Sequence, residues 1–230
     1  LEHGSPDDVL RWAFKEFGDR LVIATGFGVE GMALLDMAVR INSVADVFFV
    51  DTGFLFPETH DLRRRIEDRY GLRIKSFQTE LTPEAQEEKY GPRLWSRDPD
   101  LCCRIRKLEP LREALRGRTA WVTAIRRDQS PTRADSRAVE WDHKWQLVKV
   151  NPLVRWTRRD VWKYIFEHDV PYNPLHDQGY PSIGCTHCTR AVCEGEDERA
   201  GRWSGQQKTE CGLHGGSTVS LPVLGAVPVV

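Results

Sequence analysis

The chain has 230 residues, of which 40% are hydrophobic and 29% charged, and its formal net charge at pH 7 is −1. This composition predicts one sizeable core, and it lacks the basic excess that is typical of nucleic-acid-binding proteins. No apolar run is long enough to span a membrane, and the N-terminal stretch LEHGSPDDVLRW is acidic and amphipathic, unlike a secretory signal. We therefore expect a cytoplasmic protein with neither a nucleic-acid nor a membrane partner.

Short apolar runs and helical patterns alternate along the first two thirds of the chain. The apolar, β-branched runs predict strands at residues 20–24, 44–50, 73–77, 120–125 and 145–150. Helical spacing and Pro57 predict helices at 29–41, at 57–70 and at 158–168, and mostly loops and short helices from 179 onward. This alternation predicts an α/β fold with a mainly parallel sheet and helices on both faces.

Three polar loops follow predicted strands, where open parallel sheets bind their ligands. The first, TGFGVEG at 25–31, offers glycines and a helix N-terminus to a phosphate or sulfate, but it also fits a purely structural turn. It matches neither the P-loop nor the dinucleotide-binding pattern. The second, DTGFLFPET at 51–59, fits a helix-capping turn at Asp51 equally well.

The third loop, RRDQSPTR at 126–133, holds Arg126, Arg127 and Arg133. Arginines in loops are often merely solvated. Three of them at the carboxyl end of a buried strand nevertheless favour recognition of an anion, because the guanidinium group is a fork-shaped donor.

Four of the six cysteines form two pairs that suit a shared metal centre. Cys185 and Cys188 have the spacing of a ligand half-site, and the adjacent Cys102 and Cys103 supply the other half. Four thiolates fit either Zn²⁺ or an iron–sulfur cluster, and the adjacent pair favours the cluster, whose irons lie at separate corners. Lys107 follows the pair by four residues and can project toward the same place.

The other two cysteines stand apart from these pairs. Cys193 is interpreted as an incidental thiol. Cys211 lies between Lys208 and His214, whose positive charge would favour the nucleophilic thiolate, whereas Glu210 would oppose it. Cys211 is therefore a candidate nucleophile on a glycine-rich arm, with an exposed loop cysteine as the alternative.

Together these motifs resemble the phosphoadenylyl/adenylyl-sulfate reductase family, and specifically its cluster-containing assimilatory branch. The resemblance runs in order over about 190 residues. It is carried by TGFGVE (25–30), DTGFLFPET (51–59), CCRIRKLEPL (102–111), IRRDQSPTRA (125–134), NPLVRW (151–156), YPSIGCTHCTRAV (180–192), GEDERAGRW (195–203) and KTECGLH (208–214).

The resemblance implies a fold of the adenine-nucleotide alpha hydrolase type with a mobile C-terminal segment. It divides the chain into a nucleotide-binding α/β domain (1–178), a cluster-completing and catalytic segment (179–214) and a tail of unknown role (215–230). It also implies that a [4Fe-4S] cluster, inactive in redox turnover, is bound by Cys102, Cys103, Cys185 and Cys188.

The implied reaction is thiol-dependent reduction of adenosine 5'-phosphosulfate (APS) to sulfite and AMP, through a thiosulfonate on Cys211 that thioredoxin or a similar dithiol protein releases. His214 would assist the nucleophile. The implied substrate contacts are Thr25, Gly26, Phe27, Gly28, Lys107, Arg133, Arg199 and Arg202. The sequence leaves the oligomeric state open, and a homo-oligomer is one of the alternatives.

Three alternatives remain. A phosphoadenylyl-sulfate (PAPS) reductase performs the same chemistry, but that branch typically lacks the four cluster cysteines. An ATP-dependent adenylating enzyme of the same fold carries an SGGxDS-type loop, which TGFGVEG does not match. A zinc-binding module without enzymatic activity would use the four cysteines structurally.

Overall fold

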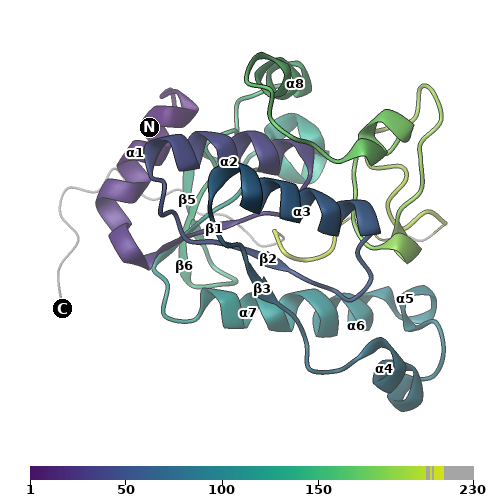
Figure 1. Ribbon diagram of the computed structural model, residues 1–230. Helices are drawn as coiled ribbons and strands as arrows, with labels where there is room; N and C mark the ends of the chain where they lie inside the picture. Colours follow the sequence, from purple (N-terminus) through teal and green to yellow (C-terminus); the bar gives the residue numbers. More distant parts are fainter. Residues whose placement is uncertain (206–207, 209, 215–230) are drawn as a thin grey trace.

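The computed structural model describes residues 1–205, 208 and 210–214, and the predicted tail segment 215–230 lies outside the described residues. Its centre is a six-stranded sheet of order β3-β2-β1-β4-β6-β5 (Figure 1). The strands are β1 (Leu21–Ala24), β2 (Val47–Val50), β3 (Lys75–Phe77), β4 (Ala120–Val122), β5 (Val139–Asp142) and β6 (Leu147–Val150). All neighbours pair in parallel except β5 and β6, which pair antiparallel.

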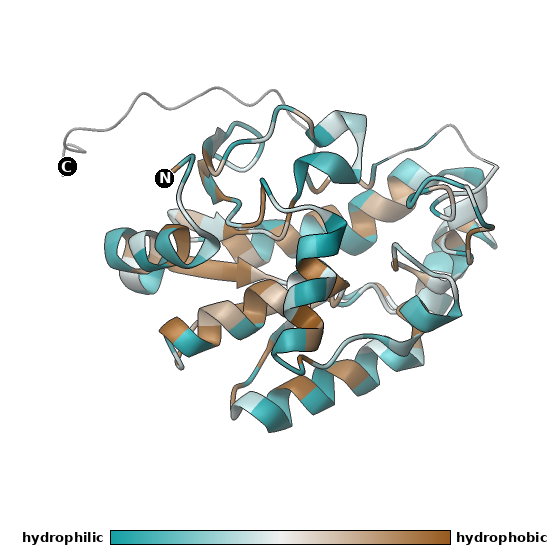
Figure 2. Ribbon diagram, turned by 90° about the horizontal axis from the view of Figure 1, so that it is seen from above, coloured by the Kyte–Doolittle hydropathy of each residue, from teal (hydrophilic) through white to brown (hydrophobic). Residues whose placement is uncertain are grey.

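Successive residues of the central strands enter two different apolar cores. Leu21 and Ile23 join the larger core, whereas Val22 between them joins the smaller one with Trp121. This follows from the two-residue period of a strand, which sends neighbouring side chains to opposite faces. In Figure 2 the hydrophobic strands lie between helices that carry both hydrophobic and hydrophilic residues. The sheet is therefore buried on both faces, as a parallel sheet requires.

Helices cover both faces of the sheet (Figure 1). The larger core receives residues from α1 (Pro6–Phe17), α2 (Val29–Ile41), α3 (Pro57–Tyr70) and α8 (Arg158–Glu167). The smaller core receives Leu111, Ala114 and Leu115 of α7 (Glu109–Leu115) on the opposite face. The remaining helices are α4 (Pro83–Tyr90), α5 (Leu94–Arg97) and α6 (Pro99–Cys103), with short 3-10 turns at Gly18–Arg20, Arg127–Gln129, Pro131–Arg133, Pro174–Gln178 and Thr186–Cys188.

A widened helical turn connects α6 to α7. Residues Arg104–Leu108 form a π-helix between these two helices. Pro110 lies at the start of α7 and has no N–H to donate to the carbonyl four residues earlier, which favours a local departure from α-helical bonding. π-helical turns often occur at functional sites. This one begins directly after Cys103 and contains Lys107.

The fold class predicted from sequence is confirmed, and the predicted strands and helices are present within a few residues of their expected ends. The helices at 29–41 and 57–70 have the expected bounds. The antiparallel strand β5 was not predicted, because its four residues VEWD are too few to show a strand period clearly. In the described part of the chain, no helix is long and apolar enough to cross a membrane.

A buried carboxylate joins three helices of the larger face. Asp36 of α2 accepts hydrogen bonds from Tyr70 of α3 at 2.7 Å and Tyr164 of α8 at 2.6 Å, and it pairs with Arg40 at 2.7 Å. Burial and the hydrogen bond to Asp36 raise the pKa of both tyrosines, which therefore stay protonated donors. This network fixes α3 and α8 against α2.

Replacing Asp36 by Ala should lower the free energy of unfolding by about 2–4 kcal/mol, because two partly buried hydroxyls and Arg40 lose their buried acceptor. Asp61→Ala is the matched control, since Asp61 pairs with Arg64 on the exposed surface of α3 and should cost less than about 1 kcal/mol. Urea denaturation measures both. Equal losses in the two variants would contradict a structural role for the network.

Candidate functional site

A cavity of about 270 Å³ lies beyond the carboxyl ends of the central strands. Its lining comes from all three polar loops, the second through Thr52 and Leu55, and from two stretches near the C-terminus, 181–185 and 198–203. Glu210, Cys211 and His214 complete it. The cavity therefore gathers segments that lie up to about 190 residues apart in the sequence.

The first loop presents backbone rather than side chains to this cavity. Thr25, Gly26 and Gly28 line it, and Gly28 is the N-cap of α2, so the free N–H groups of the first helical turn lie beside it. The Thr25 hydroxyl accepts a hydrogen bond from the Phe27 N–H at 3.2 Å, which tightens the turn. The side chain of Phe27, an expected substrate contact, instead packs in the core against Phe49.

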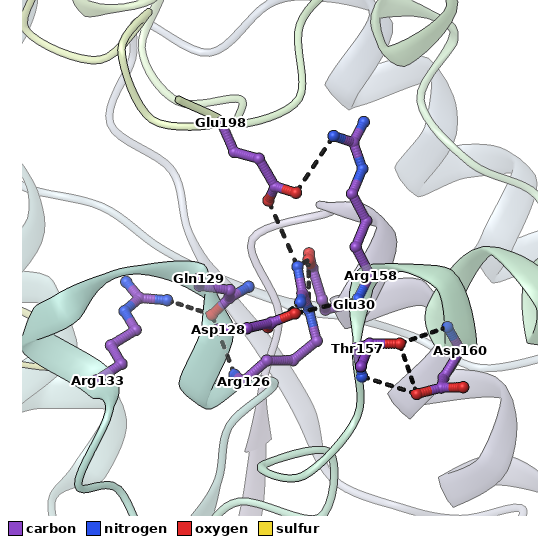
Figure 3. A network of polar contacts seen from close by, with 9 residues as sticks. All are labelled: Glu30, Arg126, Asp128, Gln129, Arg133, Thr157, Arg158, Asp160 and Glu198. Carbon is purple, nitrogen blue, oxygen red and sulfur yellow. Dashed lines mark hydrogen bonds and ion pairs between the residues drawn. The ribbon is translucent and has the colours of Figure 1, made fainter. Parts of the chain in front are cut away.

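The third loop is organised around the buried side chain of Arg126, which is 1% exposed. Arg126 pairs with Glu30 at 2.9 Å, with Asp128, and with Glu198 at 3.5 Å (Figure 3). These three carboxylates belong to α2, to the third loop and to the C-terminal segment, so Arg126 holds the three together. Its role is structural rather than recognition of an external anion.

The other two arginines of this loop, Arg127 and Arg133, lie in different surroundings. Arg127 donates to Glu2 and to the Ser136 carbonyl, away from the cavity. Arg133 lines the cavity, and its guanidinium donates to Gln129, which also accepts from the Arg126 backbone N–H at 3.1 Å (Figure 3). The anion-binding expectation for this loop therefore narrows to Arg133.

Three more expected cations line the same cavity: Lys107, Arg199 and Arg202. Burial lowers the pKa of Lys107, but the nearby Cys185, Cys211 and Cys103 raise it to a net value above its usual range. The buried ammonium group is therefore charged.

Arg202 is packed tightly between backbone and aromatic surface. Its guanidinium lies 4.6 Å from the Trp203 ring centroid and donates to Ser182 at 3.2 Å. A Cβ on Gly184 would lie 2.2 Å from it, so a larger residue there would displace the Arg202 guanidinium. The Arg202 Nε is buried and finds no hydrogen-bond acceptor among the described residues, which leaves a donor beside the cavity.

The four paired cysteines line a second, smaller cavity. Cys102 and Cys103 lie on the last turn of α6, and Cys185 and Cys188 flank a 3-10 turn at Thr186–Cys188. A short antiparallel bridge between Leu55 and Cys185 ties this turn to the second polar loop. Lys107 and Cys185 also line the main cavity, so the two cavities share a wall.

The donor set of the second cavity fits a polynuclear metal group. Burial, followed by the other cysteines, raises the pKa of Cys102 to about 12 and that of Cys188 to about 11, so stable thiolates there need added positive charge. The buried Arg106, which also lines this cavity, has a terminal nitrogen without an acceptor among the described residues. No three His, Cys, Asp or Glu side chains in that part of the chain converge as ligands of one ion. All four cysteines instead line the second cavity together.

Cys211 lines the main cavity, and the three residues that follow it are held by contacts with the body of the protein. The Gly212 carbonyl accepts from Lys144, and the Leu213 carbonyl accepts from Trp145 Nε1 at 3.1 Å. The His214 ring stacks on Trp121 at 5.6 Å between centroids. Cys193 is exposed and lines neither cavity, which agrees with its interpretation as an incidental thiol.

Sequence reasoning did not assign several residues of the site, namely Glu30, Glu198, Glu210, Trp203, Lys144 and Trp121. Glu210 was considered only as a charge acting against the thiolate. The acidic residues act by pairing with distant arginines, and no local spacing reveals such pairs. Trp203 has a positive φ of 48° and lies within 6 Å of the charged groups of Lys107, Arg202 and Lys208.

Comparisons with known proteins agree on one family. Residues 20–191 match the phosphoadenosine phosphosulfate reductase domain. The chain is 52% identical to the adenosine 5'-phosphosulfate reductase of Halalkalibacterium halodurans, covering 93% of both chains, and 51% identical to adenosine 5'-phosphosulfate reductase 2 of Bacillus subtilis, covering 90% and 88%.

Solved structures give the same result for the fold. The phosphoadenylyl-sulfate reductase of Candida auris superposes with a TM-score of 0.73 at 34% identity, covering 83% of this chain and 91% of that one. The FMN adenylyltransferase of Candida glabrata superposes with a TM-score of 0.57 at 14% identity, covering 83% and 69%, and shows the fold alone.

The His214 imidazole should remain neutral at neutral pH. Burial lowers its pKa well below the usual 6.5, and Lys149, Arg133, Arg199 and Lys144 act in the same direction. Its Nδ1 is buried without a partner among the described residues. We expect the ring-carbon NMR signal of His214, assigned with His214→Gln, not to titrate around pH 6.5 in the folded protein. A midpoint near that value would contradict this environment.

Proposed function

Because the chain belongs to the phosphoadenosine phosphosulfate reductase family, we propose that it reduces APS to sulfite and AMP with Cys211 as the nucleophile. One observation carries the residue assignment. Cys211 lines the same cavity as Lys107, Arg133, Arg199 and Arg202. A thiol beside four cations suits attack on a doubly anionic phosphosulfate.

We assign the nucleotide to the edge of the cavity formed by the first loop. Thr25, Gly26 and Gly28 leave backbone open there, and the first turn of α2 offers N–H groups to an anionic oxygen. Phe27 does not line the cavity, since its side chain is in the core and its N–H donates to Thr25. The phosphosulfate then points toward the cationic wall that holds Lys107 and Arg202.

In the first step the Cys211 thiolate attacks the sulfur of APS. A sulfur–sulfur bond forms, the sulfur–oxygen bond to the phosphate breaks, and AMP leaves with the bonding electrons. Negative charge grows on the leaving phosphate, where fixed cations such as Lys107 stabilise it. The neutral His214, close to Cys211 in the chain and in the same cavity, can orient the nucleophile, since its lowered pKa disfavours taking up a proton.

In the second step a dithiol protein of the thioredoxin class supplies two electrons. One of its thiolates attacks the Cys211 Sγ, releases sulfite and forms a mixed disulfide. Its second thiol resolves that disulfide, which regenerates Cys211 and leaves the partner oxidised. Such exchange needs reduced thiols, so we assign the protein to the cytoplasm.

We further propose that Cys102, Cys103, Cys185 and Cys188 bind a [4Fe-4S] cluster. When bound, the cluster supplies the positive charge that keeps the four buried thiols ionised. Lys107 borders both cavities, so its ammonium group lies between the thiol set and the substrate's negative charge. It positions the phosphosulfate while offsetting the charge of the thiolates.

APS is preferred over PAPS as the proposed substrate. The relatives that are about half identical over most of the chain are named adenosine 5'-phosphosulfate reductases, whereas the structural relative named as a PAPS reductase is 34% identical. The presence of all four paired cysteines favours the same choice.

Cys211→Ser should reduce sulfite formation from APS by about a thousandfold or more, because serine lacks a nucleophile that can be resolved by a dithiol. Sulfite release with a dithiol reductant measures this, and turnover on PAPS is compared in the same assay. Cys193→Ser is the matched control and should retain full activity, since Cys193 is exposed and outside both cavities.

The metal content of the same variants tests the cluster separately. Anaerobically purified Cys211→Ser should keep stoichiometric iron and acid-labile sulfide, whereas Cys185→Ser should lose them. Residual activity in Cys211→Ser would refute the assigned nucleophile, and zinc without iron in the wild-type protein would refute the cluster.

A further inference from the structure

Glu210, the residue before the proposed nucleophile, is held between two arginines of the main cavity. Its carboxylate lies 3.2 Å from both Nε and a terminal nitrogen of Arg133, and 3.0 Å from a terminal nitrogen of Arg199. The Thr132 hydroxyl donates to it at 3.2 Å. Burial raises the pKa of Glu210, but Arg133 and Arg199 lower it to a net value below the usual range. The group is therefore an anion.

Arg133 is also held by the body of the protein, through a residue other than Glu210. Its remaining terminal nitrogen donates to Gln129, and Gln129 in turn accepts from the backbone N–H of Arg126 (Figure 3). Arg126 is itself held by the carboxylate of Glu30 on α2. Glu210 therefore pairs with an arginine that is connected to α2 through Gln129, Arg126 and Glu30.

The three paired side chains are largely shielded from solvent, which strengthens the ionic contacts between them. The side chains of Glu210, Arg133 and Arg199 are 17%, 11% and 16% exposed. A bidentate, charge-assisted contact in such a site is stronger than an exposed ion pair. Without the carboxylate, the guanidinium groups of Arg133 and Arg199 would lose the anion that they share. Closure of the arm is thus linked to charge balance in the cavity.

We infer that Glu210 is a positioning residue for the reaction: its pairing with Arg133 and Arg199 closes the arm and holds Cys211 in the cavity. The inference rests on the proposed function for its meaning in catalysis. While Glu210 is docked, three nitrogens of Arg133 are each directed at a protein acceptor. The four cations then have two different roles. Arg133 and Arg199 close the arm, whereas Lys107 and Arg202 bind the phosphosulfate.

The variant Glu210→Gln keeps the size and some hydrogen bonding of the side chain but removes its charge. We expect the single-turnover rate of Cys211 thiosulfonate formation at saturating APS to fall about tenfold or more, since a charge-assisted contact that holds the nucleophile is lost. Glu210→Asp, which restores the charge, should recover part of the rate. The affinity for AMP, which does not require the arm, should change by less than about twofold.

The matched control is Glu196→Gln. Glu196 lies on the same C-terminal segment and also pairs with an arginine, Arg190, but on the exposed surface and outside the cavity. It should leave the single-turnover rate unchanged. Iron content and the thermal unfolding midpoint of all variants show that each is folded and loaded.

A second readout needs no substrate. The rate of Cys211 alkylation by iodoacetamide is followed to its pH-independent limit, so that a change in thiol ionisation alone does not count. If Glu210 closes the arm, this limit should be several times higher in Glu210→Gln than in the wild type and in Glu196→Gln.

Three results would overturn the inference. These are an unchanged single-turnover rate in Glu210→Gln, tighter AMP binding as its main effect, or an equal loss of rate in Glu196→Gln. Tighter AMP binding would mean that Glu210 competes with substrate for the arginines. Absence of any Cys211 adduct in the wild type would instead refute the proposed function, and the alkylation rates would still report whether Glu210 closes the arm.

Discussion

The site depends on one electrostatic constraint, which is that several cations are buried at the carboxyl edge of a parallel sheet. Lys107, Arg133, Arg199 and Arg202 line one cavity, and taking such charges out of water is costly unless anions accompany them. The protein supplies part of this compensation itself, through Glu210 for two arginines, and an ionised cysteine near Lys107 would add to it. The remaining positive charge is available to an anionic substrate. Anion recognition, closure of the arm and the state of the thiols are thus coupled.

The local backbone explains how adjacent cysteines and a lysine serve two cavities at once. Cys102 and Cys103 end α6, and the π-helical turn that follows places Lys107 between the thiol set and the main cavity. Arg106, the preceding residue, turns the other way, onto the Thr52 carbonyl and the Phe54 ring. Neighbouring charges therefore have different tasks. Arg106 ties the turn to the second loop, and Lys107 faces the main cavity.

The sequence predicted the sheet well, because the buried strands are short apolar runs and the helices between them start at clear signals such as Pro57. The sequence also located the three polar loops, because each of them follows one of these apolar strands. It also paired Cys102 and Cys103 with Cys185 and Cys188, which the fold does bring around one cavity. Residue type alone could not separate Arg126 from Arg133, since both are arginines in one loop, although the family resemblance implied a substrate contact for Arg133 only. Only tertiary structure shows that Arg126 is enclosed by three carboxylates while Arg133 faces the cavity. The role of Glu210 was missed for the same reason, since its partners lie 11 and 77 residues away.

The central claim is that sulfur is transferred to one particular cysteine of six. The most direct test incubates the anaerobically purified protein with labelled APS, without a reductant, and maps its peptides by mass spectrometry. The account predicts a single added SO₃ group on the peptide that contains Cys211, and release of one equivalent of AMP. An adduct on Cys193 or on a paired cysteine, or sulfite released by a reductant with no protein adduct formed beforehand, would contradict it.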